Sequence, residues 1–378
     1  MADKADPPRT ADGRVPHAGM PPLEPRRKPL SLFEFWPTKL FYAPMALYWV
    51  WLAIRYRGTT LPTNANPGFP GSGLIGESKF EVLSRVTDNA RNLLAHYTRL
   101  KCVGADTHVE KVDRALAVMR HAGLDFPVVL KPDIGCRGIG VQVARSREDL
   151  AGYLSEFPEH ADLLIQELID LEGEAGIFYV RYPGAENGEI FSVTLKYFPY
   201  VIGNGRATLR ELIERDSRAG RIADIYLPRH RDRLDEVIPE NEAFRLAFAG
   251  SHSRGTIFRD GQRFVTPAMT RAFDAIARDI PEFYFGRFDI RFADFAEVRA
   301  GRGFRIVEVN GAGGEATHVW DSGIRLIDAY RALMRQYDHL HAIGAINRNR
   351  GYKPMSLFGM ARLYATEKRL NPHYPLTH

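Results

Sequence analysis

The sequence has few cysteines, no long tract of one charge and no long apolar segment, and each shortage excludes a class of protein. Two cysteines among 378 residues cannot form a disulfide framework, so we expect a chain from a reducing compartment, the cytoplasm. Lysine and arginine are scattered, the net charge is only +5, and no nucleic-acid-binding module is recognisable, so we expect no nucleic acid partner. A small anionic ligand explains this mild excess of positive charge equally well.

The N-terminal part has its own character. Residues 1–30 are rich in proline and arginine and lack both apolar periodicity and the apolar core of a signal peptide, which predicts a disordered tail. In the region 31–104, residues 40–54 are uncharged and rich in aromatic side chains, and they predict an apolar helix shorter than the about 20 residues that span a bilayer. Its tyrosines, tryptophans and flanking cations suit peripheral contact with the inner membrane. The alternatives are packing against the rest of the chain, which we favour slightly, or a homodimer contact. Residues 58–76 then read as a linker.

Three oxygen-bearing residues lie in two predicted strands. Asp289 is part of the strand 286–291, and Glu308 and Asn310 end the strand 306–310. If these strands lie side by side, the three side chains form an all-oxygen cluster. Such a cluster suits Mg²⁺, with Mn²⁺ as a substitute, because the ion keeps water molecules and substrate phosphates in its shell. The pattern predicts a metal site that serves nucleotide chemistry.

A glycine-rich loop upstream fits the phosphates of such a nucleotide. An apolar strand ends in Lys131, and a loop with Gly135, Gly138 and Gly140 follows before the next strand. Glycines allow positive φ and let backbone N–H groups approach phosphate oxygens. The loop joins strand to strand, whereas a P-loop or a Rossmann loop opens a helix, so neither fingerprint fits. The alternative is an ordinary turn, which the nearby lysine and the downstream carboxylates make less attractive.

In order along the chain, these segments resemble the ATP-grasp superfamily, the fold of D-alanine–D-alanine ligase, cyanophycin synthetase and related carboxylate–amine ligases. The resemblance covers about residues 105–325 of a predicted domain 105–345. It implies an α+β fold in which two lobes hold ATP between them. It also implies an ADP-forming ligase that uses ATP and Mg²⁺ to join a small-molecule acid to an amine through an acyl phosphate.

The resemblance assigns roles residue by residue. Arg287 resembles the arginine that stabilises the acyl phosphate, and Gly314 lies where the ligases offer a backbone N–H to the same oxyanion. Lys131 resembles the lysine on the phosphates, Glu167 and Leu168 the adenine hinge, and Glu174 the ribose carboxylate. The implied ATP-binding residues are Lys131, Gly135, Arg137, Gly138, Gly140, Gln166, Glu167, Leu168 and Glu174, and the implied metal ligands are Asp289, Glu308 and Asn310.

The sequence also departs from the family. The family's earlier lysine has no clear counterpart, with Lys111 and then Lys101 as candidates. Val319 and Trp320 follow His318 where D-alanine ligases have a Ser-Leu pair, so a D-alanine ligase is not expected.

Several further residues have open roles. Glu315 suits a cationic amine or is a solvated loop acid. Lys196 either reaches the γ-phosphate or is an ordinary edge-strand lysine. His252 and Arg254 either bind a carboxylate or phosphate or are structural, and His318 is a further candidate for binding substrate.

Two alternatives to a ligase stay open. The first is an ATP-grasp kinase that phosphorylates a hydroxyl. The second is a non-catalytic ATP-binding module recruited to a membrane.

The final residues, 346–378, are basic and contain proline, and they read as a C-terminal tail.

Overall fold

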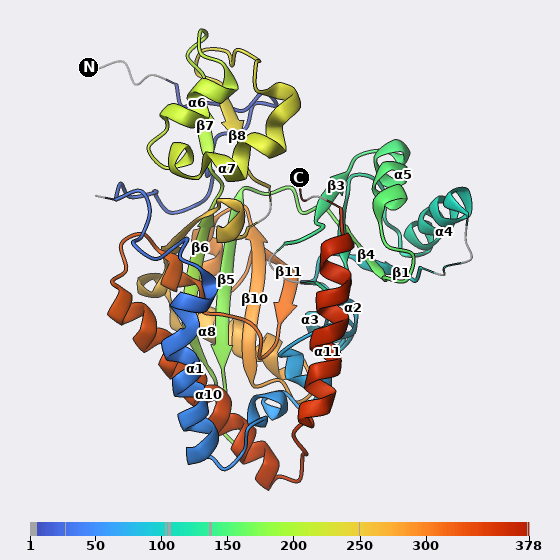
Figure 1. Cartoon of the computed structure of the whole chain (residues 1–378), viewed down its shortest axis with the longest axis vertical. Coiled ribbons are helices and arrows are strands. Elements are labelled where there is room, and N and C mark those ends of the chain that lie inside the picture. Colours follow the sequence, from blue (N-terminus) through green and yellow to red (C-terminus); the bar gives the residue numbers. More distant parts are fainter. Residues whose placement is uncertain are drawn as a thin grey trace.

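The computed structural model describes residues 6–26, 28–102, 104, 107–135, 138–248, 250–375 and 377. The described strands form three sheets, and every strand pair within them is antiparallel (Figure 1). Helices pack against these sheets, so the chain has the mixed α+β architecture that the sequence predicts.

The largest sheet has the main core on one face, and its other face carries polar side chains and a smaller apolar cluster that includes Phe178, Val180 and Phe285. Neighbouring residues of a strand point to opposite faces. Phe288 and Ile290 are therefore fully buried in the core, whereas Arg287 and Asp289 share the other face. The core face is covered by α8 (Pro267–Arg278), which begins where the Thr266 hydroxyl accepts a hydrogen bond from the backbone of Met269. In sheet order the strands are β11 (Phe304–Asn310), β10 (Phe285–Phe292), β5 (Gly173–Val180), β6 (Glu189–Tyr197) and β9 (Ile257–Asp260).

A second, four-stranded sheet carries the glycine loop. Its apolar face packs against α4 (His108–His121) and α5 (Arg147–Glu156). Thr107 and Glu110 form a capping box at the start of α4, which explains where that helix begins. In sheet order the strands are β1 (Tyr97–Leu100), β4 (Leu163–Glu167), β2 (Val128–Pro132) and β3 (Gln142–Ala144).

A small unit with its own core is inserted between β6 and β9. The strands β7 (Tyr200–Ile202) and β8 (Ala243–Arg245) pair beside α6 (Leu209–Arg215) and α7 (Ala223–Tyr226), at the top of Figure 1. A capping box of Thr208 and Glu211 is present at the start of α6.

The apolar segment 40–54 is helical and lies within α1 (Thr38–Arg55). One side of α1 packs beside α10 (Leu326–Asn349), and Phe41, Met45 and Leu52 are buried there. Tyr48 donates a hydrogen bond to Asp338 on α10 at 2.8 Å. None of the helices in the described part of the chain is both long and apolar enough to cross a bilayer.

The predicted linker 58–76 is packed rather than loose. It contains the short turns η1 (Leu61–Asn64) and η2 (Pro70–Gly73). The amide of Asn66 is fully buried, donates to the carbonyl of Phe285 at 2.7 Å and accepts from the backbone N–H of Tyr284 at 2.9 Å. The linker therefore fixes the beginning of β10, the strand that carries the site. The helices α2 (Lys79–Ser84) and α3 (Asp88–Arg91) follow.

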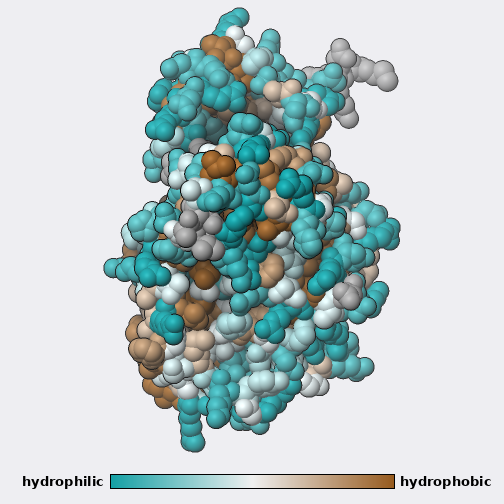
Figure 2. Space-filling view, turned by 90° about the vertical axis from the view of Figure 1, so that its right-hand side faces the viewer, coloured by the Kyte–Doolittle hydropathy of each residue, from teal (hydrophilic) through white to brown (hydrophobic). Residues whose placement is uncertain are grey.

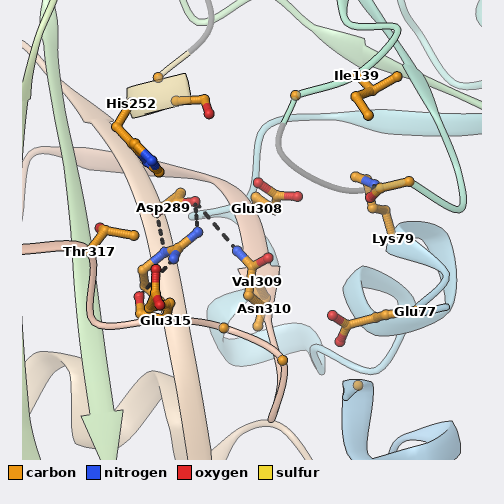
Figure 3. Close-up of a pocket in the computed structure, with 18 of the residues that line it drawn as sticks. Glu77, Lys79, Ile139, His252, Asp289, Glu308, Val309, Asn310, Glu315 and Thr317 are labelled. Carbon is orange, nitrogen blue, oxygen red and sulfur yellow. Dashed lines mark hydrogen bonds and ion pairs between the residues drawn. The ribbon is translucent and has the colours of Figure 1, made fainter. Parts of the chain in front are cut away.

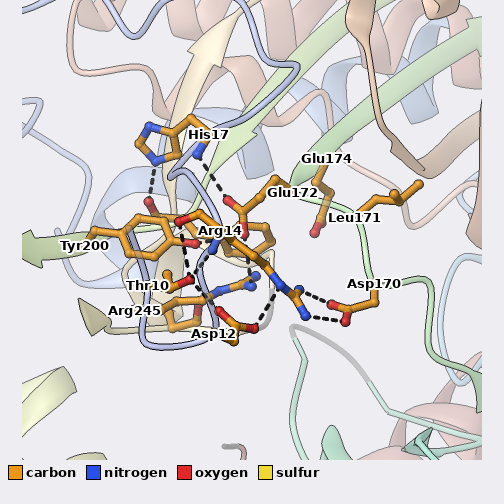
Figure 4. A network of polar contacts seen from close by, with 12 residues as sticks. Thr10, Asp12, Arg14, His17, Asp170, Leu171, Glu172, Glu174, Tyr200 and Arg245 are labelled. Atoms are coloured by element: carbon orange, nitrogen blue, oxygen red, sulfur yellow. Dashed lines mark hydrogen bonds and ion pairs between the residues drawn. The ribbon is translucent and has the colours of Figure 1, made fainter. Parts of the chain in front are cut away.

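The described part of 1–30 corrects the expectation of a disordered tail. Arg14 forms an ion pair with Asp170, and the backbone N–H of His17 donates to Glu172 at 3.2 Å (Figure 4). The hydroxyl of Tyr197 donates to the carbonyl of Pro21 at 2.9 Å. Composition alone missed this because the segment uses polar contacts with distant residues instead of an apolar pattern of its own.

The C-terminal residues also differ from the predicted tail. Helix α10 continues to Asn349, and 346–378 then forms α11 (Leu357–Leu370) and the turn η8 (Asn371–His373). Tyr374 packs on Phe157 with ring centroids 5.6 Å apart and joins the core of the second sheet. A hydroxyl of this segment, on Thr377, donates to the carbonyl of Gly138 at 2.7 Å. The remaining short elements are α9 (Phe295–Arg299), η3 (Ala219–Ile222), η4 (Leu227–Arg233), η5 (His252–Arg254), η6 (Gln262–Phe264) and η7 (Thr317–Trp320).

Candidate active site

A cavity of about 650 Å³ lies where strands of the two larger sheets meet, and most of the predicted site residues line it (Figure 3). Gly140, Arg254 and His318 are not among its lining residues. Arg137 lies outside the described residues. The lining residues that the sequence predicts are Lys131, Gly135, Gly138, Gln166, Glu167, Leu168, Glu174, Lys196, His252, Arg287, Asp289, Glu308, Asn310, Gly314 and Glu315.

The pairing of β10 with β11 brings the predicted metal ligands together. Asp289 lies opposite Glu308, and Arg287 lies opposite Asn310, so the four side chains share one face of the sheet. The amide of Asn310 donates to Asp289 at 3.4 Å. Two carboxylates and one amide oxygen fit Mg²⁺, because water and phosphate oxygens can complete its shell. No cluster of three or more His, Cys, Asp or Glu side chains suited to a metal occurs among the described residues, so any metal here relies on Asn310 and the substrate.

Asp289 is also the centre of an ion-pair network. Arg287 binds both of its oxygens at 2.9 Å, and the Nζ atom of Lys196 lies 3.1 Å from Oδ1. Burial by itself raises the pKa of Asp289, but the two cations outweigh burial and lower it to about 2. Asp289 is therefore ionised, as a metal ligand must be. A metal would share its carboxylate with these cations or displace them.

Glu174, the predicted ribose carboxylate, is a second acid in this ion-pair network. Its carboxylate is buried between Lys196 at 3.0 Å and Arg291 at 2.9 Å. Burial raises its pKa, yet these two cations more than compensate, and the pKa is lowered. Both oxygens are thus already in ion pairs, and a ribose hydroxyl would share one of them with Lys196 or Arg291. The network also places Lys196 inside the large sheet, so it is not an ordinary edge-strand lysine.

Lys131 extends from β2 toward β11. Its ammonium group donates to the side-chain oxygen of Gln166 at 2.6 Å and to the carbonyl of Val307 at 3.3 Å. Burial lowers the pKa of Lys131 to about 8, although nearby Glu308 acts to raise it. These acceptors are uncharged, so they orient the ammonium group and leave its positive charge available to an anionic ligand.

The predicted adenine hinge, Glu167 and Leu168, is held in place by contacts of Glu167 with Arg305 and His96. The carboxylate of Glu167 pairs with Arg305 at 3.0 Å and accepts from the backbone of His96 at 3.0 Å. The backbone N–H of Glu167 donates to the carbonyl of His96 at 2.7 Å. These contacts fix the end of β4, while Glu167 and Leu168 line the cavity.

The opposite end of the cavity is built around Glu315. One carboxylate oxygen accepts from the hydroxyl of Tyr42 on α1, and the other accepts from the indole N–H of Trp320 at 2.9 Å. Arg287 donates to the backbone carbonyl of Glu315 at 2.9 Å. His252 stacks on Trp320 with ring centroids 4.4 Å apart. Glu315 is therefore a fixed carboxylate facing the cavity rather than a solvated loop acid.

Gly314 requires a correction. Its backbone N–H donates to the carbonyl of Gly311 at 2.9 Å, closing a turn. That N–H is therefore occupied in this conformation and not available to an oxyanion.

His318 and the candidates for an earlier lysine lie away from the cavity. His318 is hydrogen-bonded to Ser192 at 2.7 Å, and burial lowers its pKa. Lys111 is buried and donates to the carbonyls of Leu154 and Phe157 at 3.3 and 3.0 Å. Lys101 is exposed. None of the three lines the cavity, so these predictions describe structural or surface residues.

The cavity is also lined by charged and aromatic residues to which the sequence analysis assigned no role. Among them, Glu77 comes from the segment before α2, Lys79 from the start of α2, Arg291 from β10 and Tyr42 from α1. Arg291 was detectable, because it follows Arg287 and Asp289 on the same strand face. The other three are brought in by tertiary packing, which no local pattern reveals.

Comparison with known proteins gives partial matches. No family model matches the chain. Cyanophycin synthetase from Synechocystis sp. is 27% identical over an alignment of 218 residues that covers 51% of this chain and 24% of that protein. The chain resembles the ATP-grasp ligases. It spans well under two thirds of cyanophycin synthetase.

Two kinds of solved structure are similar at low TM-scores. A bifunctional glutathione synthetase from Pasteurella multocida has a TM-score of 0.36 and 15% identity, covering 70% of this chain and 37% of that one. D-alanine–D-alanine ligase from Bacillus anthracis, also solved with ATP, has a TM-score of 0.39 and 11% identity, covering 78% of this chain and 71–72% of the ligase chains.

Proposed function

We propose that the protein is an ATP- and Mg²⁺-dependent ligase that joins a carboxylic acid to an amine through an acyl phosphate. One observation carries the proposal. Across a single cavity, Lys131 and the glycine loop face the cluster of Arg287, Asp289, Glu308 and Asn310. This arrangement sets phosphate-binding groups opposite oxygen ligands for a cation, with room between them for reacting groups.

The side chains suggest how the reaction runs. An oxygen of the acid attacks the γ-phosphorus of ATP, and ADP leaves; the amine then attacks the acyl carbon, loses a proton and expels phosphate. Lys131 binds the phosphates and Arg287 the acyl phosphate oxygens. Asp289, Glu308 and Asn310 would hold Mg²⁺, which neutralises charge on the transferred phosphoryl group when bound. Glu315 lies where it can orient the amine.

The turn at Gly314 favours a second candidate. Because its N–H is engaged by Gly311, the site lacks the donor expected for a tetrahedral oxyanion. A kinase, in which a hydroxyl attacks the γ-phosphorus, has no such intermediate. Product mass separates the two reactions, since a ligase yields an amide and a kinase yields a phosphate ester.

The deciding experiment measures ADP release with panels of acids and amines. We expect Asp289→Ala and Glu308→Ala to lower the rate at least about 100-fold, because each removes an anionic ligand of the transition-state cation. Glu297→Ala is the matched control, because Glu297 is an exposed carboxylate paired with Arg302. Rates equal to the control in both site variants would exclude this metal site.

We also propose that α1 lies on an anionic membrane surface. Its outer face exposes Leu40, Leu47, Val50, Trp51 and Ile54, with Leu47 at 75% and Ile54 at 72% exposure. The helix has no acidic residue, while Lys39, Arg55 and Arg57 lie at its ends. This pairing of apolar and basic residues fits anionic lipid. Figure 2 shows a mostly hydrophilic face with hydrophobic side chains in small patches near its top, across its middle and at its lower left edge.

Co-sedimentation with vesicles tests this contact. We expect binding to vesicles that contain phosphatidylserine and weak binding to pure phosphatidylcholine. Leu47→Glu with Ile54→Glu should abolish binding, whereas Leu357→Glu with Phe358→Glu, an exposed apolar pair on α11, should not. No vesicle binding together with a dimer that Leu47→Glu dissociates would favour a second copy of the chain instead.

A further inference from the structure

The end of the cavity around Glu315 is walled by aromatic side chains from separate parts of the chain. Tyr42 and Trp49 come from α1, Trp320 from η7 and Tyr337 from α10. Tyr42 and Trp49 lie about two helical turns apart and so share one face of α1. The rings of Trp49 and Tyr337 meet edge to face with centroids 5.2 Å apart, which joins the two helices at the cavity. Further aromatic lining comes from Trp36, Phe41 and Phe258.

Two acids line this end, and they have different partners. Glu34 is paired with Arg218 at 2.5 Å. The carboxylate of Glu315 accepts instead from the hydroxyl of Tyr42 and the indole N–H of Trp320, which are both uncharged. Within the described part of the chain, no ion pair includes this carboxylate, because Arg287 binds Glu315 through its backbone carbonyl. A partly buried carboxylate with neutral donors favours a cationic ligand in the cavity.

The aromatic rings suit such a cation and the rest of its molecule. A positive group over the face of an aromatic ring is attracted by the electrons of the ring, and apolar walls favour an apolar body. Burial, and after it the charge of Glu315, raise the pKa of Tyr337 to about 12, so this phenol lies near the carboxylate. One ligand can therefore meet the carboxylate and the rings together.

The same end offers no cation for a carboxylate on the ligand. The lysines and arginines among the described lining residues either pair with an acid or lie toward the glycine loop and β4. Arg287 pairs with Asp289, Lys196 and Arg291 pair with Glu174, Lys79 donates to Gly135, and Lys131 donates to Gln166. An amino acid bound at Glu315 would thus place its own carboxylate among acids and aromatic rings.

We propose that the amine substrate is a primary monoamine with an apolar, ring-bearing body and no carboxylate. Its ammonium group pairs with Glu315, and its body lies against Tyr42, Trp49 and Tyr337, which are then specificity-determining residues. This inference rests on the proposed ligase function. It places the amine beside Arg287, the residue proposed to bind the acyl phosphate.

Calorimetric titration of the protein with three matched ligands tests the substrate class without requiring turnover. Phenethylamine carries the proposed ammonium group and ring, phenethyl alcohol lacks the charge, and phenylalanine adds a carboxylate. We expect phenethylamine to bind at least about tenfold more tightly than either of the others, because only it matches both the charge and the walls. Phenylalanine binding as tightly as phenethylamine would overturn the proposal.

Glu315→Gln tests the ionic contact. Glutamine keeps an oxygen acceptor for Tyr42 or Trp320, so we expect an unchanged thermal midpoint. The variant should weaken phenethylamine binding about 10- to 100-fold and leave phenethyl alcohol binding unchanged. Asp338→Asn is the matched control, because Asp338 accepts from Tyr48 of α1 outside the cavity lining. Equal losses for the amine and the alcohol would show that the charge of Glu315 is not recognised, which overturns the ionic pairing.

Tyr337→Leu tests the aromatic wall. Leucine keeps an apolar side chain, so we expect binding of phenethylamine to fall about 3- to 10-fold because a π face is lost. Tyr48→Phe, which alters a tyrosine of α1 outside the lining, is the control. Unchanged binding to Tyr337→Leu, with an unchanged thermal midpoint, would overturn the role of this ring.

Product analysis separates the failure of this inference from that of the proposed function. If phenethylamine binds as expected but no acid yields an amide with any amine, the ligase function is wrong and the amine site stands. If amides form with amino acids in preference to phenethylamine, the function stands and the substrate class is overturned.

Discussion

At the scale of single residues, the fold lowers the pKa of Lys131 into a pH range that experiments can reach. An unfolded lysine has a pKa of about 10.4, whereas burial lowers that of Lys131 to about 8. Between these values the unfolded chain binds more protons than the folded chain, so this lysine makes the free energy of unfolding rise with pH. Below about pH 8 both states are protonated and the full cost of burying the charge is present.

The same titration predicts the pH dependence of ATP binding. Bound phosphate favours protonated Lys131, so the Kd for ATP should rise on the order of tenfold or more between about pH 7.5 and 9.5. Lys131→Arg should remove most of this dependence, because arginine stays charged throughout. Calorimetric titration across this range provides the measurement, and a wild-type Kd that does not change with pH would contradict the assignment.

At the scale of elements, close packing of two glycine-bearing loops holds the end of β11 against the N-terminal region. A Cβ added to Gly313 would lie 2.5 Å from the carbonyl oxygen of Leu74, and one added to Gly73 would lie 2.2 Å from the Glu77 carboxylate. The contact at Gly313 is with backbone, which cannot move aside, and Gly73 has a φ of +68°, so glycine is favoured at both positions.

Gly313→Ala should therefore lower the free energy of unfolding by about 1–3 kcal/mol, the usual cost of forcing extra volume into a packed site. The control is Gly152→Ala on α5, where an added Cβ meets nothing within 4 Å. That substitution should instead stabilise the helix by about 0.5–1 kcal/mol. Urea denaturation of both variants measures the difference, and equal destabilisation would contradict the packing argument.

Elements with a strong local signal could be predicted from the sequence. The capping box of Thr107 and Glu110 marks the start of α4, and the uncharged aromatic run of 40–54 marks α1. Segments held by distant partners could not be predicted in this way. Residues 10–21 and α11 contact the rest of the chain through polar groups or single aromatic rings, so their own composition resembles a tail.

The same distinction applies to the candidate site. Strand periodicity placed Asp289, Glu308 and Asn310 on one face, and the register of β10 and β11 agrees with that expectation. Hydrogen bonds at Gly314 and ion pairs at Glu174 depend on turn geometry and on neighbours from other strands, which periodicity does not contain.

At the scale of the whole molecule, the connection between β4 and β5 joins the two larger sheets, and the N-terminal segment and the small inserted unit both bind it. The buried carboxylate of Glu172 accepts from the hydroxyl of Tyr200 at 2.8 Å and pairs with Arg245 at 3.4 Å. It also accepts from the backbone of His17 (Figure 4). One acid thus links the connection to two other parts of the chain.

Burial decides how much each contact of this connection contributes to stability. Arg14 and Asp170 form an ion pair whose side chains are 37% and 45% exposed, so Arg14→Ala should cost less than about 1 kcal/mol. The Glu172 side chain is only 6% exposed, and Glu172→Ala would leave Arg245 and Tyr200 without their acceptor, at a cost of about 3 kcal/mol. Urea denaturation measures both free energies of unfolding, and Glu172→Gln, which keeps an oxygen acceptor, should fall between them. If Arg14→Ala and Glu172→Ala had equally small effects, the connection between β4 and β5 would be held by the two sheets alone. The contacts of the N-terminal segment and of the inserted unit with this connection would then contribute little to stability.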